Sequence, residues 1–543
     1  MQSILKNREF LLLFIILALA SFFRLWQLGQ IPPGLYPDVA IYANDAFESL
    51  KTGNFKVFYP ENNGREGLYM WILALSFSLF GVSIWSIKIV TATAGILTVL
   101  GLYLLIKELF NNVTIKQFNN ETVALLSSFF LATSFWHVNF SRIGFRAILL
   151  PLVLVFAFYF FFKGFHRRRI FNVLLAGVLF GLGFYTYISY RFIVLLLAFL
   201  LISFLFVFFR QKLQRKYLLF LFTFLFSIFL VALPIGFYFL ENPQDFSSRA
   251  SGVSVFAQEN PLKAFLISFV AHLGMFNVYG DSNWRHNFPG SPMLFFPIGV
   301  LFLIGIIFSA REFLFAAKQK NISFIILQGT LLGWFFVFLL PGILTAEGVP
   351  HALRVIGVIP IVYVFSGMGG LLFYEWVKKR IQDKRLLFIL FSLFFIFVTI
   401  AEFNKYFFLW AKNQNVEGAF TKKFAEIGYY LNSLPLDYQK YVIVNEAGVP
   451  VPFPNGIPMS AQTIMFIENT KFGSPQSVYL LPENIDKIKI KEKTPNQSLR
   501  DGTGQAVIVP MKYEQNLVTD LQRRFPQGEI EEKNGILVYK IND

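Results

Sequence analysis

The sequence predicts an α-helical membrane protein that crosses the bilayer about eleven times and carries a small soluble α/β domain at its C-terminal end. Hydrophobic residues make up 55% of the 543 residues, and the mean hydropathy is +0.56. The apolar residues form runs of about 18 or more, long enough to cross a hydrocarbon core about 30 Å thick. After residue 404 these runs stop, and shorter strand-like and helix-like segments follow.

The expected spans are apolar segments separated by short polar loops. They cover residues 10–29, 84–106, 123–139, 147–163, 170–190, 192–209, 217–240, 292–310, 323–345, 353–376 and 386–404. With this count, the loops rich in Lys and Arg at 166–169, 210–216, 311–320 and 378–385 fall on one side. Because such loops stay in the cytoplasm, we expect a multi-pass cell-membrane protein with a cytoplasmic N-terminus and an extracytoplasmic C-terminal domain.

The apolar segment at 67–81 is a special case, because as a helix it is only about 22 Å long. Counting it as a span would move residues 167–169 to the outer side, so we place it at the outer face. The alternative is a twelfth span. Before it, apolar residues from Val39 to Leu50 recur at helical spacing, which predicts a second helix lying in the membrane plane.

Two domains follow from this organisation. Residues 1–404 form the transmembrane domain, with external loops at 30–83 and 241–291. Residues 405–543 form the extracytoplasmic domain, with alternating strand-like and helix-like patterns. Strands are expected at 441–444, 506–509 and 536–539, and helices at 420–434 and 513–525.

Several classes of chemistry have no support in the sequence. There is no cysteine, and the phosphate-loop, zinc-protease and nucleophile-elbow motifs are missing. The five histidines are scattered, so no metal site is predicted; no cofactor is indicated, and a divalent metal is left open. The net charge of +16 fits cytoplasmic loops that face anionic lipids, so we expect no nucleic-acid partner.

Some cationic residues lie in the expected external segments, on the side opposite the basic loops. Arg142 and Arg146 lie in one short outer turn, and His351 and Arg354 lie at the outer start of a span. Guanidinium groups at headgroup level bind phosphate oxygens bidentately, so these four residues are candidates for binding a lipid phosphate. The alternative is that they anchor the chain among lipid headgroups.

Carboxylates in the first external loop are candidates for acid–base chemistry. Asp38 opens the in-plane helix, and Glu66 opens the short helix that follows. A carboxylate at the membrane surface can accept a proton from an acceptor hydroxyl as a general base. The alternative is structural, since Asp caps helices well and acidic residues suit the first helical turn.

Several blocks of sequence resemble the GT-C glycosyltransferases, in particular the branch of protein O-mannosyltransferases and aminoarabinose transferases (glycosyltransferase family 39). The blocks are PPGLYPDVAIYANDA at 32–46, NGREGLYMWILALSFSLFG at 63–81, NFSRIGFRA at 139–147, HNFPGSP at 286–292 and PHALRVIGVIP at 350–360. They occur in the family order over about residues 10–400. The C-terminal domain resembles nothing that we can name.

The resemblance implies a sugar donor carried on a polyprenyl phosphate. It implies Asp38 as catalytic base, with Glu66 and Arg65 as the acidic and basic residues of the second block. The family often has Asp-Glu in the first loop, whereas Val39 follows Asp38 here. The second carboxylate is therefore missing or replaced by Glu66.

Together these observations predict a GT-C-like membrane glycosyltransferase of the cell envelope. It would transfer a hexose or pentose, with inversion, to a hydroxyl of a lipid, glycan or protein acceptor. Arg142, Arg146, His351 and Arg354 would hold the donor phosphate, and membrane lipids would be the remaining partners. The alternatives are a flippase or ligase of polyprenyl-linked glycans, or a non-catalytic protein that binds polyprenyl phosphate.

Overall fold

The computed structural model describes residues 2–111, 119–212, 214–451, 456–490, 505–533 and 535–541. The chain divides into two compact units. The bundle unit comprises Met1–Leu28, Arg65–Tyr69 and Lys88–Lys412, and the α/β unit comprises Gly29–Gly64, Met70–Ile87 and Asn413–Asp543. Residues 30–83 are thus divided between the two units.

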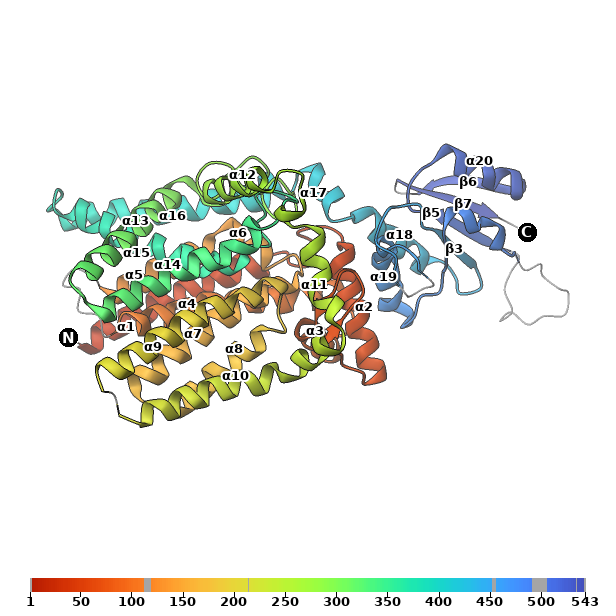
Figure 1. Ribbon diagram of the computed structural model, residues 1–543. Helices are drawn as coiled ribbons and strands as arrows, with labels where there is room; N and C mark the ends of the chain where they lie inside the picture. The colour runs from red at the N-terminus through yellow and green to blue at the C-terminus, as the bar shows by residue number, and fades with distance from the viewer. Residues whose placement is uncertain are drawn as a thin grey trace. The chain divides into compact units, whose positions relative to one another are not determined.

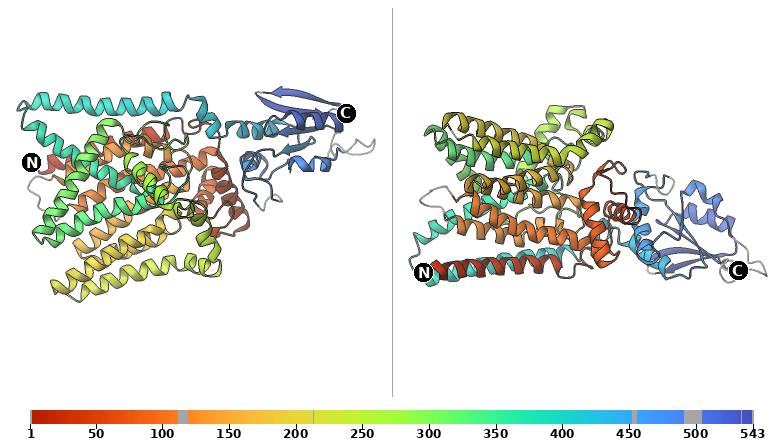
Figure 2. Two further views of the ribbon diagram at one scale, coloured as in Figure 1. Left: turned by 45° about the horizontal axis from the view of Figure 1, so that its top comes forward. Right: turned by 90° about the horizontal axis from the view of Figure 1, so that it is seen from below.

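The bundle unit is built from apolar helices that run along one common direction (Figures 1 and 2). These are α1 (Gln2–Leu25), α4 (Ile84–Leu109), α5 (Asn120–Thr133), α7 (Leu149–Arg167), α8 (Ile170–Gly183), α9 (Ile193–Arg210), α10 (Lys216–Glu241), α13 (Phe296–Lys318), α14 (Ile322–Ile343), α15 (Ile359–Lys378) and α16 (Lys384–Asn404). Shorter helices join them: α6 (Phe135–Phe140), η1 (Arg146–Ile148), η2 (Ile188–Phe192), α11 (Pro243–Gly252), η3 (Val255–Ala257), α12 (Pro261–Gly274), η4 (Ile356–Val358) and the π-helix η5 (Lys405–Trp410).

The predicted fold class is confirmed. In the described part of the chain, 8 helices are long and apolar enough to cross a membrane. The other expected spans correspond to α1, α5 and α8. Helices α5 and α8 have 14 residues each, and α5 is shorter than the sequence predicts. It stops because Ser134 caps the next helix, where its hydroxyl accepts the main-chain N–H of His137 at 3.4 Å.

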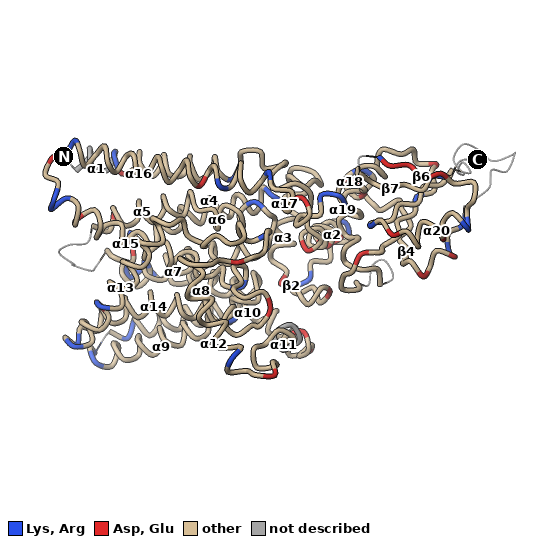
Figure 3. The backbone as a smooth tube through the Cα atoms, turned by 90° about the horizontal axis from the view of Figure 1, so that it is seen from above, with Lys and Arg blue, Asp and Glu red and all other residues tan. Residues whose placement is uncertain are grey.

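The loops rich in Lys and Arg gather at one end of the bundle unit. The connections between α7 and α8, α9 and α10, α13 and α14, and α15 and α16 lie at the end where the N-terminus is drawn (Figures 1 and 3). The opposite end carries α6, η1 and η2. This separation agrees with the alternation of basic and non-basic loops in the sequence.

The α/β unit contains a mixed sheet of 5 strands in the order β4-β3-β5-β7-β6. Strand β3 is parallel to β4 and β5, and β7 is antiparallel to β5 and β6. Its strands are β3 (Gln439–Ile443), β4 (Val478–Leu480), β5 (Ala506–Pro510), β6 (Gly528–Lys533) and β7 (Ile536–Ile541); its helices are α17 (Gln414–Ala419), α18 (Lys422–Ser433), η6 (Met459–Ala461), α19 (Gln462–Phe472), η7 (Pro482–Lys487) and α20 (Gln515–Arg524). The expected strands and helices are all present.

Alternating strand residues supply a separate apolar core on each face of this sheet. Val442, Val507 and Val538 pack with residues of α18 and α19 on one face. Ile443 and Ile508 pack with residues of α20 on the other. This two-residue alternation follows from strand geometry, and it makes the sheet the centre of the unit.

The segment Gly29–Gly64 contributes α2 (Pro37–Thr52) and the strand β1 (Phe58–Tyr59) to the α/β unit; the strand β2 (Arg65–Glu66) follows. The carbonyl of Leu35 accepts the hydroxyls of Thr421 and Thr463, both at 2.9 Å. Gly34 has φ +73°, and a Cβ there would lie 2.4 Å from the carbonyl oxygen of Phe420. Only glycine permits this close approach. The helix that begins beside Asp38 is therefore packed on the C-terminal domain.

The short apolar segment at 67–81 folds as α3 (Leu68–Phe80), which has 13 residues. It is shorter than a span requires, as expected. The ring of Phe77 stacks on that of Phe466 in α19, with centroids 6.1 Å apart. The Ser76 hydroxyl donates to the carbonyl of Ser86 at 2.7 Å. These contacts join α3 to the α/β unit.

Candidate functional site

A buried cluster of charged residues lies in the bundle unit at the end opposite the basic loops. The guanidinium of Arg146, in η1, lies 3.0 Å from a carboxylate oxygen of Glu66, and both side chains are at most 3% exposed. A nitrogen of Arg191 lies 3.9 Å from the other oxygen. Two arginines thus face one carboxylate, and guanidinium groups also suit phosphate oxygens.

The segment that carries Glu66 is anchored to the bundle unit by two hydrogen bonds. The Leu68 N–H donates to the carbonyl of Tyr185 at 3.3 Å, and the Tyr69 hydroxyl donates to the carbonyl of Gly144 at 2.7 Å. Arg65, next to Glu66, is 1% exposed. The second family block therefore enters the bundle unit next to the turn that contains Arg146.

Arg142 has different partners from Arg146. Its guanidinium donates to the carbonyls of Phe23 at 3.0 Å and Trp26 at 2.8 Å, at the end of α1. It also lies over the ring of Phe407, 5.1 Å from the centroid. These bonds satisfy carbonyls that a helix end leaves unpaired.

The sequence analysis did not single out Arg24, although it is fully buried in the same region. Its guanidinium donates to the carbonyls of Ala20, Leu131 and Ala132, and one nitrogen lies 2.7 Å from Nδ1 of His137. Arg24 could have been identified from the sequence because it lies inside the first apolar segment, where a charge usually marks a function or a buried network.

A cavity of about 310 Å³ lies beside the cluster, and Tyr187 and Arg354 are among its lining residues. The guanidinium of Arg146 lies over the Tyr187 ring, 5.3 Å from its centroid. Arg354 donates to the carbonyl and a carboxylate oxygen of Glu347, both at 2.7 Å. One predicted phosphate-binding arginine thus lines the cavity, and a second contacts another of its lining residues.

A second cavity of about 520 Å³ is lined mainly by apolar residues, with Arg191 at its wall. The Arg191 guanidinium lies over the ring of Phe246, 4.4 Å from the centroid, and donates to the Phe246 carbonyl at 2.7 Å. Apolar walls beside a cation suit a molecule with a lipid chain and an anionic head.

Asp38 lies in the first turn of α2, where Tyr36 is the N-cap. The carboxylate of Asp38 is partly exposed and accepts a hydrogen bond of 2.5 Å from the side-chain amide of Asn62. The helix-cap interpretation therefore fails for this residue. Its carboxylate is held in place by a side chain and remains accessible.

A polar pocket of about 370 Å³ lies within the α/β unit, between α2 and α19. Its polar lining residues are Asn44, Asp45, Glu48, Lys51, Glu61, Gln462, Asn469 and Ser474. The amide of Asn44 donates to Oε1 of Gln462 at 2.7 Å, and Asn469 donates to Oδ1 of Asn44 at 2.9 Å. Asn62, which holds Asp38, follows Glu61 directly.

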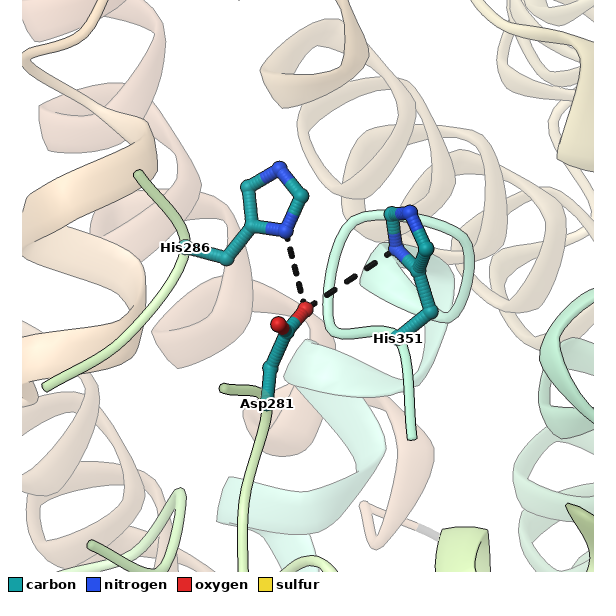
Figure 4. Close-up of side chains that lie close together, drawn as sticks. All are labelled: Asp281, His286 and His351. Carbon is teal, nitrogen blue, oxygen red and sulfur yellow. Dashed lines mark hydrogen bonds and ion pairs between the residues drawn. The ribbon is translucent and has the colours of Figure 1, made fainter. Parts of the chain in front are cut away.

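His351 lies in the segment between α14 and η4, three residues before Arg354. Its ring, together with Asp281 and His286, forms a group of three possible metal ligands (Figure 4). Among the residues that the structure describes, these three form the one group of His, Cys, Asp or Glu side chains whose spacing could hold a metal ion. No histidine spacing in the sequence predicts it.

The helical bundle with its buried charge cluster and the appended α/β domain define a polytopic membrane protein with the GT-C glycosyltransferase fold. Residues 68–235 match the family model described as dolichyl-phosphate-mannose-protein mannosyltransferase. The resemblance predicted from the sequence is thereby confirmed. No curated protein sequence matches the chain.

Solved structures share the fold at low sequence identity. ArnT from Cupriavidus metallidurans, bound to undecaprenyl phosphate, is 13% identical with a TM-score of 0.52, over 98% of this chain and 97% of that chain. AglB from Archaeoglobus fulgidus, an oligosaccharyltransferase in complex with an inhibitory peptide and a dolichol-phosphate, is 13% identical with a TM-score of 0.50, over 99% and 74%. This chain spans 63% of an Archaeoglobus fulgidus oligosaccharyltransferase tethered with an acceptor peptide (85% of this chain, 15% identity, TM-score 0.49).

Proposed function

We propose that the protein is a membrane glycosyltransferase that moves a sugar from a polyprenyl-phosphate donor to an acceptor hydroxyl outside the cytoplasm. The observation that carries this proposal is the cluster of Arg146, Glu66 and Arg191 between two cavities, one of them mainly apolar. The guanidinium groups suit a phosphate, and the apolar walls suit a prenyl chain. The ArnT and AglB structures with polyprenyl phosphates support it.

In the proposed reaction the acceptor hydroxyl attacks the anomeric carbon, and the bond from that carbon to the phosphate oxygen breaks. Asp38 accepts the hydroxyl proton. Polyprenyl phosphate leaves with the bonding electrons, and its charge is stabilised by arginine, so no strong general acid is needed. This single displacement inverts the anomeric centre. Glu66 orients Arg146 through their ion pair.

The arginines differ in their expected contribution to donor binding. Two nitrogens of Arg142 are hydrogen-bonded to the carbonyls of Phe23 and Trp26, so we expect donor binding to depend mainly on Arg146, Arg191 and Arg354. Arg354→Ala should weaken binding of polyprenyl phosphate to the purified protein about tenfold or more, because a charge-assisted hydrogen bond contributes about 1.5–3 kcal/mol. Arg311→Ala, exposed in α13, is the control. Equal affinities of both variants and the wild type would remove Arg354 from the site.

We propose that the α/β unit is extracytoplasmic, and the lack of cysteine makes this simple to test. Asn54→Cys lies in the first external loop, and Lys379→Cys lies in the last basic loop; both positions are exposed. A membrane-impermeant maleimide should label residue 54 in intact cells and residue 379 only after permeabilisation. Labelling with the opposite pattern would place the proposed base in the cytoplasm.

We further propose that the pocket between α2 and α19 binds the acceptor. Its amides and carboxylates can hydrogen-bond several hydroxyls, and it lies next to the loop that holds Asp38. Asn469→Ala should raise KM for the acceptor about tenfold and leave KM for the donor unchanged, in initial-rate measurements. Asn415→Ala, exposed in α17, should change neither value. An unaltered acceptor KM in Asn469→Ala would place acceptor binding elsewhere.

A further inference from the structure

The side chains of Asp281, His286 and His351 converge on one point in the bundle unit (Figure 4). Nδ1 of His286 lies 2.8 Å from Oδ2 of Asp281, and Nδ1 of His351 lies 3.9 Å from the same oxygen. The three possible ligand atoms all lie within 4.8 Å of one another. Asp281 and His286 are each 3% exposed. Three metal-ligating atoms thus share a small, largely enclosed space.

Neighbouring groups hold the side chains of Asp281 and His286 in place. The Asp281 carboxylate accepts the N–H of Asn283 at 2.8 Å and the N–H of Ala352 at 2.7 Å. The His286 ring stacks on that of Phe140, with centroids 5.7 Å apart. These contacts orient the ligand atoms before any ion binds, as supporting residues do in metal sites.

The main chain at His351 is positioned by another histidine, His272. The main-chain N–H of His351 donates to Nε2 of His272 at 3.1 Å. His272 therefore carries its proton on Nδ1, which donates to the carbonyl of Ser268 at 2.8 Å. The main chain of the loop that carries His351 is thereby linked to α12.

We propose that Asp281, His286 and His351 bind a divalent transition-metal ion of the Zn²⁺ class. Two imidazole nitrogens and one carboxylate oxygen favour such an ion over Mg²⁺ or Ca²⁺, which prefer oxygen ligands. Bond lengths of about 2.0–2.2 Å in a tetrahedral shell place ligand atoms about 3.3–3.6 Å apart. The distances of 2.8 and 3.9 Å bracket this spacing. Each imidazole would bind through a deprotonated Nδ1, and the displaced protons would pass to solvent.

The ion would join two loops that lie far apart in the sequence. Asp281 and His286 come from the segment between α12 and α13, and His351 comes from the segment between α14 and η4. Three protein ligands leave one tetrahedral position for water or another oxygen ligand. Ion binding at this site does not depend on the proposed transferase activity.

The test is direct binding of Zn²⁺ to the full chain, purified with a tag that contains no histidine and treated with a chelator. Titration calorimetry and elemental analysis should find one equivalent of Zn²⁺ per chain, and Zn²⁺ should raise the thermal unfolding midpoint. MgCl₂ should produce no such shift. Asp281→Asn and His351→Gln should each weaken Zn²⁺ binding more than about tenfold.

His166→Gln is the matched control, because Nδ1 of His166 also faces a carboxylate, 3.6 Å from Glu108. This variant should bind Zn²⁺ like the wild type. If Asp281→Asn fails to fold, His351→Gln decides, since it keeps both main-chain hydrogen bonds to Asp281. A wild-type protein that takes up no Zn²⁺ at tens of micromolar, or unchanged binding in His351→Gln, would overturn the proposal. The three side chains would then form a hydrogen-bonded cluster only.

Discussion

Replacing Asp38 with Asn should slow sugar transfer about 10²–10⁴-fold, the usual contribution of a general base. The asparagine keeps the shape of the side chain, and its oxygen can still accept the hydrogen bond from Asn62. Folding and binding of polyprenyl phosphate should therefore remain as in the wild type. Initial rates with saturating donor and acceptor, together with the thermal unfolding midpoint, measure both parts of this expectation.

Asp245→Asn is the matched control for this prediction. Asp245 also lies in the first turn of a short helix, α11, and accepts one side-chain hydrogen bond, from Tyr238 at 2.7 Å. It should retain full activity. Asn62→Ala should lower the rate less than Asp38→Asn does, since it removes the support of the carboxylate and leaves the base itself. Full activity in Asp38→Asn would exclude this residue as the base.

Breaking the buried pair of Arg146 and Glu66 should produce the largest loss of stability. Arg146→Met leaves the Glu66 carboxylate buried with only the more distant Arg191. Removing one partner of a buried ion pair typically costs about 3–5 kcal/mol, because the remaining charge is no longer compensated. The thermal unfolding midpoint of the detergent-purified protein should fall clearly.

A double variant, Arg146→Met with Glu66→Leu, separates stability from function. It removes both charges, so most of the stability should return, whereas donor binding should stay weak. Lys422→Met is the control, because its ion pair with Glu417 is 2.9 Å long but exposed. Such a pair contributes less than about 1 kcal/mol. An Arg146→Met protein that unfolds at the wild-type temperature would contradict the assigned role of the pair.

The helices of the bundle unit could be predicted because each apolar run is itself the signal for a span. The end of α5 could not be predicted in this way, because it depends on one local hydrogen bond between the Ser134 hydroxyl and the main-chain N–H of His137. Composition also marked the C-terminal α/β domain. It could not show that the first loop packs on that domain, because the bond from Thr463 to Leu35 joins residues 428 positions apart.

The candidate site shows the same limit. Arg142 and Arg146 look equivalent in the sequence, yet the carbonyls of α1 bind one and Glu66 binds the other. The sequence around Asp281 carries no signal of a metal site, because an aspartate in a polar loop is common. Its possible role depends on folding, which brings His351 close to it. Residue type predicted which side chains carry charge; only the fold decides which charges meet.

The most direct test of the central claim is a transfer assay with the purified protein in liposomes. Polyprenyl phosphates carrying different radiolabelled sugars are supplied with extracts of membrane lipids, glycans and proteins as acceptors. We predict that for at least one sugar the label leaves the polyprenyl phosphate and appears on an acceptor with the wild type, but not with Asp38→Asn. Label that stays on the polyprenyl phosphate for every sugar, while the protein binds that lipid, would contradict a transferase and favour a carrier or a binding protein.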